Sequence, residues 1–359
     1  MTIELHFPES YRGLFARTQD RYAPLIREAL QRLEDMDVPT DLRPFLAYQM
    51  WENPQPSFVL FPFMFLATAE VSGGIRRSHE EYLSMILLFC ALCAVADDTI
   101  DRSPKRSGRA TFAGRYGDTS AMAMASALVT MVMHASRHDT RLADAAYDFF
   151  LPFFGLELWE VSNVYPEPDL FTDWLDHRYD QAIVATAFTL NAALILNEQP
   201  LWPQTAIAAL SRVAQDVDDV VNILEFRARD GENDDLQSGV VTKPLVLTIA
   251  RSSAVGAEVD GFWRAYKELA QRRLSIEHLA EERARLTARL WPQYVSIRAR
   301  LVDTGVPETI RSSLVDMKLA VNMSPLYLRA LMRDFASSFL DRLRRCEQVR
   351  VDASVVLSV

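Results

Sequence analysis

Three carboxylates close the most apolar stretch of the chain, and their spacing is the first sign of chemistry. Asp97, Asp98 and Asp101 end the run CAVADDTID. If that run is a helix, residues three and four apart share one face. Carboxylates at a helix C-terminus oppose the helix dipole and repel one another, so a compensating cation is expected. Mg²⁺ prefers oxygen ligands and commonly bridges carboxylates to phosphates. Taken alone, the cluster fits a magnesium site and a solvated helix end equally well.

A second acidic cluster lies further along the chain, in the run AQDVDDVVNILEFRAR. Its polar residues fall at helical intervals on one stripe: Asp218, Asn222, Glu225 and Arg229. Two carboxylates, an amide oxygen and an arginine suit a metal site that also holds a diphosphate. Taken alone, the stripe is better explained as an exposed helix surface. A di-iron bundle is excluded, because no histidine follows a glutamate by three positions.

The elements that position these clusters are predicted to be helices. Helical periodicity and good helix formers are frequent, whereas strand patterns are scarce. The clearest predicted helices are 80–101, 121–136, 142–164, 171–196, 204–229, 258–290 and 326–345. No internal repeat or low-complexity linker divides the chain, so residues 1–359 are predicted to form a single all-α domain. The polar stretch Leu274–Arg289 is predicted to be a solvated helix face.

Composition and charge exclude several functional classes. The chain has 359 residues, of which 49% are hydrophobic, and a net charge of −10. This charge argues against nucleic-acid partners, which require a basic surface. Cys90, Cys93 and Cys346 cannot form a disulfide framework, and the first two are predicted to be buried thiols. The longest apolar run, Met85–Ala96, is too short to span a membrane, and no signal peptide is recognised. A cytoplasmic protein without stable membrane insertion is therefore expected.

Five segments, in order, resemble the trans-isoprenyl diphosphate synthase family. The segment 73–78 (GGIRRS) is similar to the family's GGKRxRP, and 97–101 (DDTID) to its first aspartate-rich motif. The segment 106–111 (RSGRAT) resembles RRGxPT, and 215–222 (QDVDDVVN) resembles the second motif, FQxxDDxxD. The segment 235–245 (DLQSGVVTKPL) resembles DLREGKxTLPL. The resemblance covers a core of about 73–249 and implies an all-α, single large helical bundle of the isoprenoid synthase type.

The departures from the family pattern concern basic residues that hold isopentenyl diphosphate in its elongation enzymes. Uncharged residues occupy their positions: Ile75, Ser78, Ser107, Gln181 and Val240. Each lost charge-assisted contact costs about 1.5–3 kcal/mol, so losing three reduces affinity roughly 10³-fold or more. Arg106, which matches the residue facing the allylic diphosphate, is retained. The allylic site is therefore expected to be kept and the second site lost.

This combination resembles the class I terpene synthases (terpene cyclases), which share the fold and take only an allylic diphosphate. The segment 174–178 (WLDHR) is similar to the one that carries the diphosphate-sensing arginine, Arg178 here, of bacterial terpene synthases. By that likeness Ala182 lies at a helix break facing the substrate. Asp218 and Asn222 resemble the first two ligands of the second metal motif, with Glu225 as the candidate for the third.

The resemblance implies ionisation of a linear allylic prenyl diphosphate, followed by cyclisation to a terpene hydrocarbon or alcohol. It implies Mg²⁺ as cofactor, about three ions per site, held by Asp97, Asp101, Asp218, Asn222 and Glu225. The candidate catalytic residues are Asp97, Asp98, Asp101, Arg178 and Ala182. The further candidates for binding the diphosphate are Arg106 and Arg229. A carbocation needs a dry aromatic pocket, for which the candidates are Phe89, Phe153, Phe154, Trp159 and Phe188.

The residues before the first aspartates bear on substrate length. Ala91, Leu92 and Cys93 stand where short-chain enzymes of the family place bulky side chains. The room that they leave favours geranylgeranyl diphosphate, with farnesyl and C25 substrates as alternatives. Two other functions stay open: a trans-prenyltransferase or polyprenyl diphosphate synthase, and a non-catalytic subunit that binds prenyl diphosphate. The family resemblance also implies a homodimer.

Overall fold

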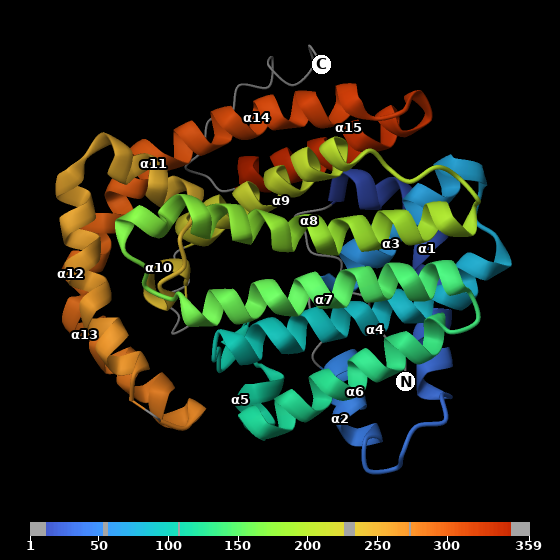
Figure 1. Cartoon of the computed structure of the whole chain (residues 1–359), viewed down its shortest axis with the longest axis horizontal. Coiled ribbons are helices and arrows are strands. Elements are labelled where there is room, and N and C mark those ends of the chain that lie inside the picture. The colour runs from blue at the N-terminus through green and yellow to red at the C-terminus, as the bar shows by residue number, and fades with distance from the viewer. Residues whose placement is uncertain (1–11, 53–56, 107, 226–233, 273, 346–359) are drawn as a thin grey trace.

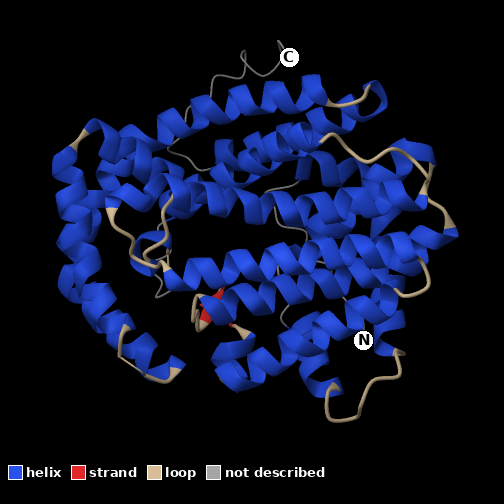
Figure 2. Cartoon of the chain, viewed as in Figure 1, coloured by secondary structure: helices blue, strands red, loops and turns tan. Residues whose placement is uncertain are grey.

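Apolar runs with helical periodicity fold into a bundle of helices, as Figure 2 shows. The computed structural model describes residues 12–52, 57–106, 108–225, 234–272 and 274–345. Within these ranges the only strands are β1 (Lys105–Arg106) and β2 (Arg109–Ala110), which form a short antiparallel hairpin. The predicted all-α fold class is confirmed.

The described α-helices are α1 (Arg12–Glu34), α2 (Arg43–Ala47), α3 (Ser57–Gly73), α4 (Arg77–Ile100), α5 (Phe112–Tyr116), α6 (Asp118–Ser136), α7 (Thr140–Ser162), α8 (Phe171–Leu196), α9 (Gln204–Glu225), α10 (Asp235–Ser238), α11 (Lys243–Arg251), α12 (Ser253–Ala270), α13 (Ile276–Arg300), α14 (Val306–Met323) and α15 (Leu326–Arg345). Short turns of other helical types are η2 (Tyr48–Glu52), η3 (Pro168–Leu170) and η5 (Leu301–Gly305).

The predicted helices agree with the described ones except in one place. The bounds of α8 and α15 are those predicted from the sequence. The prediction of one helix over 258–290 is wrong, because α12 ends at Ala270 and α13 begins at Ile276. The side chain of Ser275 accepts a hydrogen bond from the backbone N–H of His278 and so caps α13. The predicted end of α9 at Arg229 lies outside the described residues.

α4 lies in the centre of the bundle and explains where its apolar sequence goes. Eight consecutive residues, Met85–Leu92, are fully buried. A helix that is apolar on all faces must be buried on all faces. Cys90 lies in this buried stretch, whereas Cys93 is half-buried, and burial raises the pKa of both thiols. Cys346 lies outside the described residues.

Among the residues that the structure describes, three helical segments are long and apolar enough to span a membrane by length and composition alone: α4, α6 and Pro168–Leu196. The sequence argument considered only the uninterrupted apolar run, which is shorter than the complete helices. The bundle itself buries 78% of the apolar window of α4, compared with 33% for α6. The apolar composition of α4 is therefore accounted for by its place in the core.

One end of the bundle gathers the elements that carry the acidic clusters. α4 and α7 end there and α8 begins there, at the left of Figure 1. α10 lies beside this end, and the pair α12–α13 extends across it towards α5 (Figure 1). Residues far apart in the sequence are thus brought together at this end of the bundle.

Candidate active site

The first acidic cluster lies at the end of α4 and is paired with an arginine from the hairpin. Arg106 Nε donates to Asp98 Oδ1 at 2.6 Å, and its Nη2 pairs with Asp97 Oδ2. Burial raises the pKa of Asp98 to about 6, although the Arg106 charge opposes this shift. Burial, with a smaller contribution from Asp97, also holds the pKa of Asp101 well above its usual value. The structure thus brings together three of the predicted acids and one predicted diphosphate-binding arginine.

The second cluster lies where α8 faces α9. Arg178 Nη2 donates to Asp219 Oδ1 at 2.9 Å and lies 3.6 Å from Asp235 Oδ1. Gln215 Nε2 donates to the same Asp219 oxygen at 2.8 Å. Asp219 is completely buried, whereas the neighbouring Asp218 is exposed. The sequence analysis proposed Asp218 as a metal ligand and did not select Asp219 or Asp235.

The remaining described residues of the predicted stripe are less buried than Asp219. Asn222 is half-buried and Glu225, the last residue of α9, is exposed. Arg229 lies outside the described residues, as does Ser107. The helical stripe predicted for the second cluster is present as far as Glu225.

Two carboxylate oxygens in this region are buried without a hydrogen-bond partner among the described residues. They are Asp219 Oδ2 and Asp235 Oδ2, from α9 and α10. Burial, opposed by the Arg178 charge, raises the pKa of Asp235 to about 7. An unpaired buried carboxylate oxygen is costly, and the two acids share one cation, Arg178, although Gln215 also donates to Asp219. An all-oxygen donor set of this kind fits a hard divalent cation.

In this structure, however, arginines pair with the acidic side chains of the site. Over the described part of the chain, no group of three or more His, Cys, Asp or Glu side chains is placed to hold a metal ion. Arg106 pairs with Asp97, which the sequence pattern assigns to metal binding, and Arg178 pairs with Asp219, the neighbour of the predicted ligand Asp218. Binding of a cation there therefore requires the two guanidinium groups to move to another anion.

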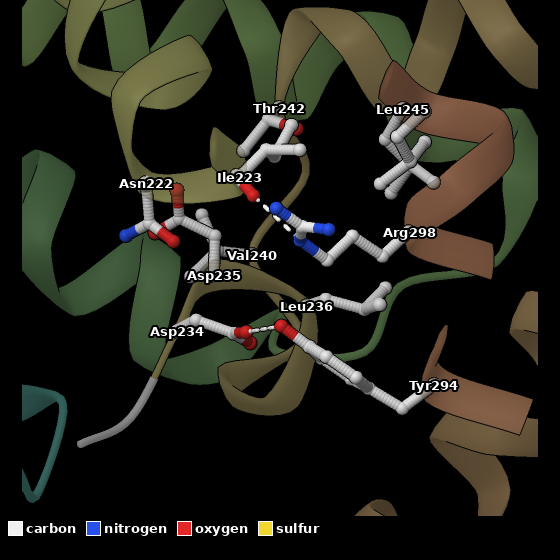
Figure 3. Close-up of a pocket in the computed structure, with 11 residues that line it drawn as sticks. Asn222, Ile223, Asp234, Asp235, Leu236, Val240, Thr242, Leu245, Tyr294 and Arg298 are labelled. Atoms are coloured by element: carbon white, nitrogen blue, oxygen red, sulfur yellow. Dashed lines mark hydrogen bonds between the residues drawn. The ribbon is translucent and has the colours of Figure 1, made fainter. Parts of the chain in front are cut away.

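A small pocket lies between the end of α9, α10 and α13 (Figure 3). Asn222 and Asp235 both line this pocket. Arg298 donates from Nε to the carbonyl of Ile223 at 2.8 Å and from Nη2 to that of Leu224 at 3.0 Å. A cation at these carbonyls stabilises the C-terminal end of the helix. Arg298 thereby fixes the end of α9 from which Asn222 projects.

α7 adds a third group of carboxylates that the sequence analysis did not select. Glu157 is only 3% exposed. Its burial, with a smaller contribution from the charge of Asp97, raises its pKa to about 10. Burial raises the pKa of Glu160 to about 7, opposed by Arg178 and by a hydrogen bond from Gln181. Glu157 and Glu160 are three residues apart in the run GLELWE and therefore share a helix face. This spacing is the signal from which the sequence could have predicted the pair.

A polar network next to the second cluster joins four helices. Asp216, which is 1% exposed, accepts hydrogen bonds from the Tyr179 hydroxyl at 2.6 Å and from Lys243 Nζ at 2.8 Å. The Ser313 hydroxyl donates to the same carboxylate at 2.6 Å. Lys243 lies three residues after Val240, where the family pattern has a lysine, but its charge is directed into this network. It does not restore the missing cation.

The candidate pocket aromatics do not all lie together. Phe89 packs against Phe188 and Phe149, with ring centroids 4.8 and 4.7 Å apart. Phe153 stacks on Phe149 at 5.0 Å and contacts the half-buried Phe154. These rings form an aromatic cluster between α4, α7 and α8.

Trp159 lies apart from the aromatic cluster. Its ring stacks on His177, with centroids 3.8 Å apart and planes 6° apart, and it also contacts Trp174. The helix break expected at Ala182 is absent, because α8 is a continuous α-helix from Phe171 to Leu196. No proline or glycine interrupts that stretch. Ala182 is half-buried, one turn after Arg178.

Comparison with solved structures identifies the fold. A polyprenyl synthase from Caulobacter crescentus, solved with calcium and isoprenyl diphosphate, superposes with a TM-score of 0.70 at 16% identity, over 97% of this chain and 100% of that one. A decaprenyl diphosphate synthase from Rhodobacter capsulatus has a TM-score of 0.64 at 16% identity, over 95% and 99%. A geranylgeranyl pyrophosphate synthase from Lactobacillus brevis has a TM-score of 0.65 at 16% identity, over 92% and 99%.

No protein-family model matches the sequence, and no curated protein matches it either. At these identities the likeness concerns the fold alone. The chain has the all-α isoprenoid synthase fold of the trans-isoprenyl diphosphate synthases.

Proposed function

We propose that this chain is an enzyme that uses divalent metal ions to ionise an allylic prenyl diphosphate and transfers the prenyl group to a second substrate. The observation that carries the proposal is the convergence of carboxylates from α4, α7, α9 and α10 around Arg106 and Arg178. The Caulobacter polyprenyl synthase, solved with calcium and isoprenyl diphosphate, supports this substrate class and a divalent metal.

The residues of the chain divide into those that hold the metal and those that hold the diphosphate. Asp97 on α4, Asp101 directly after it, and Asp218 and Asn222 on α9 would bind Mg²⁺, joined by the unpaired oxygen of Asp235. When bound, the metal neutralises charge that develops on the leaving diphosphate.

The two arginines then change partners. In the loaded site, Arg106 and Arg178 would donate hydrogen bonds to diphosphate oxygens in place of these carboxylates. A guanidinium fork matches phosphate oxygens in a bidentate geometry. The ion pairs seen here therefore hold each arginine close to the position in which it would bind substrate.

The aromatic cluster would shield the allylic carbocation from water. Phe89 lies eight residues before Asp97 on α4, about 12 Å along the helix axis. Aromatic faces stabilise cations, and a dry wall prevents premature capture by water. Phe89, Phe149 and Phe188 would therefore limit how deep the prenyl chain can extend.

Cyclisation of a single substrate is the second candidate, and a specific observation favours it. Basic residues of the family pattern are absent at Ile75, Ser78, Val240 and Gln181. Gln181 hydrogen-bonds Glu160, and Val240 is buried, so neither position offers a charge to a second diphosphate. A class I terpene cyclase acting on geranylgeranyl diphosphate needs no such second site.

One experiment separates the candidates. Purified protein is incubated with Mg²⁺ and C10, C15, C20 or C25 allylic diphosphate, each with and without isopentenyl diphosphate, and the products are identified by mass spectrometry. Longer prenyl diphosphates that form only with isopentenyl diphosphate support prenyl transfer. A hydrocarbon or alcohol formed without it supports cyclisation. Binding of the diphosphates without consumption of any would contradict both and indicate a non-catalytic subunit.

A further inference from the structure

A half-buried arginine on α13 reaches the site from outside the segments that resemble the family. Arg283 Nη1 lies 3.4 Å from the carbonyl oxygen of Arg102, to which it donates. It also donates a hydrogen bond to the Tyr165 hydroxyl, which in turn donates to the carbonyl of Gln237 at 2.8 Å. The prediction that Leu274–Arg289 forms a solvated face is therefore wrong for Arg283.

Arg283 has no carboxylate partner among the described residues. Its hydrogen-bond acceptors are a carbonyl and a phenol, neither of which carries a full negative charge. Burial lowers the pKa of Arg283, and the neighbouring Arg102 lowers it further, against the effects of Tyr165 and Asp101. A guanidinium nevertheless stays charged in proteins. A half-buried cation next to a second cation is unfavourable unless an anion offsets it.

The two loops that hold Arg283 are themselves in uncommon conformations. Arg102 has φ +50° and Tyr165 has φ +54°, both in the left-handed region that side chains other than glycine rarely adopt. A guanidinium nitrogen of Arg102 donates to the carbonyl of Leu274 and so fixes the turn before α13. Such strained residues persist where surrounding contacts hold them, and they cluster at ligand sites.

We propose that Arg283 is a diphosphate-binding residue of this site, with the diphosphate group of a prenyl diphosphate as its ligand. The identity of the ligand rests on the proposed function, whereas the position of Arg283 rests on its hydrogen bond to the strained turn at Arg102. The cation next to Asp101 then comes from α13, beyond the matched range 73–249.

The test is binding of inorganic diphosphate in the presence of Mg²⁺, measured by titration calorimetry on the full chain. Arg283→Gln is expected to weaken binding about 10- to 100-fold, the value of one charge-assisted contact. Arg285→Gln is the matched control, because Arg285 lies on the same helix, is 71% exposed and pairs with surface glutamates. It should bind within about twofold of the unchanged protein.

A second variant and a stability measurement separate binding from folding. Arg283→Lys keeps the charge but loses the bidentate guanidinium, so its diphosphate affinity should lie between those of the unchanged protein and Arg283→Gln. Since Arg283 has no ionic partner to lose, Arg283→Gln should keep its Tm within about 2 °C in the absence of ligand.

Three results would overturn the inference: equal diphosphate binding by Arg283→Gln and the unchanged protein, an equal loss in Arg285→Gln, or no binding by the unchanged protein. Binding is measured without turnover. A loss specific to Arg283→Gln in a protein that consumes no prenyl diphosphate would support the inference and contradict the proposed function.

Discussion

Arg178 and Tyr179 are consecutive residues of α8 that bind two different carboxylates of α9. Arg178 donates to Asp219 at 2.9 Å, and the Tyr179 hydroxyl donates to Asp216 at 2.6 Å. Asp216 and Asp219 are three residues apart, so both face α8. One contact belongs to the candidate site and the other to the internal network with Lys243. The position of Arg178 is therefore set by the packing of two helices and not by a loop.

Removing the Arg178 charge should destabilise the fold, because Asp219 would be left buried and unpaired. Arg178→Gln is expected to lower the free energy of unfolding by about 3 kcal/mol in urea titrations. Adding Asp219→Asn should restore more than half of that loss. Arg264→Gln, which removes an exposed ion pair with Asp260, should cost under about 1 kcal/mol. Equal costs for the two single variants would contradict the importance of the buried pair.

Asp97 is expected to matter for turnover and little for folding. Its side chain is 46% exposed and pairs with Arg106, whose side chain is 37% exposed. Asp97→Ala should reduce Mg²⁺-dependent turnover by about 100-fold or more, since a bound metal supplies several kcal/mol of transition-state stabilisation. The helical circular dichroism signal should not change. Asp144→Ala, at an exposed site on α7, is the control; full turnover in Asp97→Ala would contradict the metal assignment.

Glu157 should make stability fall with rising pH. Burial raises its pKa to about 10, against 4.5 in the unfolded chain. The stabilising effect of the bound proton is fully present below about pH 4.5 and is lost progressively as the pH rises towards 10. Glutamine has no such proton, so the unfolding free energy of Glu157→Gln should fall less steeply between pH 5 and 9.

Urea titrations with a chelator at several pH values provide this measurement. Glu281→Gln, at an exposed position on α13, should follow the unchanged protein at every pH. Parallel curves for Glu157→Gln and the unchanged protein would show that Glu157 ionises near its ordinary pKa.

The aromatic cluster should affect both stability and product. Phe188→Ala removes a buried ring that packs against Phe89, so a loss of about 3–5 kcal/mol is expected. Under conditions where the variant is folded, mass spectrometry should show products of altered chain length or skeleton. Trp159→Ala, outside the cluster, should leave the product distribution unchanged. The opposite pattern would move the prenyl chain towards Trp159.

Gly239 should tolerate no side chain. It has φ +75°, and a Cβ there would lie 2.3 Å from Tyr165 Cδ1. Gly239→Ala is expected to lower the unfolding free energy by about 2 kcal/mol through strain and displacement of Tyr165. Gly155→Ala, in α7 with no atom near its Cβ position, should instead stabilise by up to about 1 kcal/mol. A harmless Gly239→Ala would show that Tyr165 can move freely.

The sequence allowed the helices to be predicted because their periodicity is local. Phe171–Leu196 is flanked by clear breakers, and its bounds agree with the structure. The break at Ala270–Ile276 was missed because charged residues run through it and conceal the N-cap of Ser275. Propensity alone does not show such a boundary when a polar run continues on both sides.

The site was predicted only where its residues stand in a recognisable linear pattern. Asp97, Asp98 and Asp101 belong to one short motif, and Arg106 follows them closely. Glu160 and Arg283 come from other helices and acquire their meaning only from tertiary contacts, whereas Asp235 opens the matched segment 235–245 but was not selected. Asp219 shows the same limit within a motif, because helical geometry buries it beside the exposed Asp218.

The carboxylates at this end of the bundle should discriminate between a free diphosphate and one that has already bound a metal ion. The chain carries a net charge of −10, and Asp97, Asp98 and Asp235 gather at this end of the bundle. A diphosphate without metal is repelled by this acidic cluster, whereas a diphosphate already chelated by a divalent ion is nearly neutral and is repelled much less. We expect association to be faster when metal and substrate are premixed than when the metal is added last.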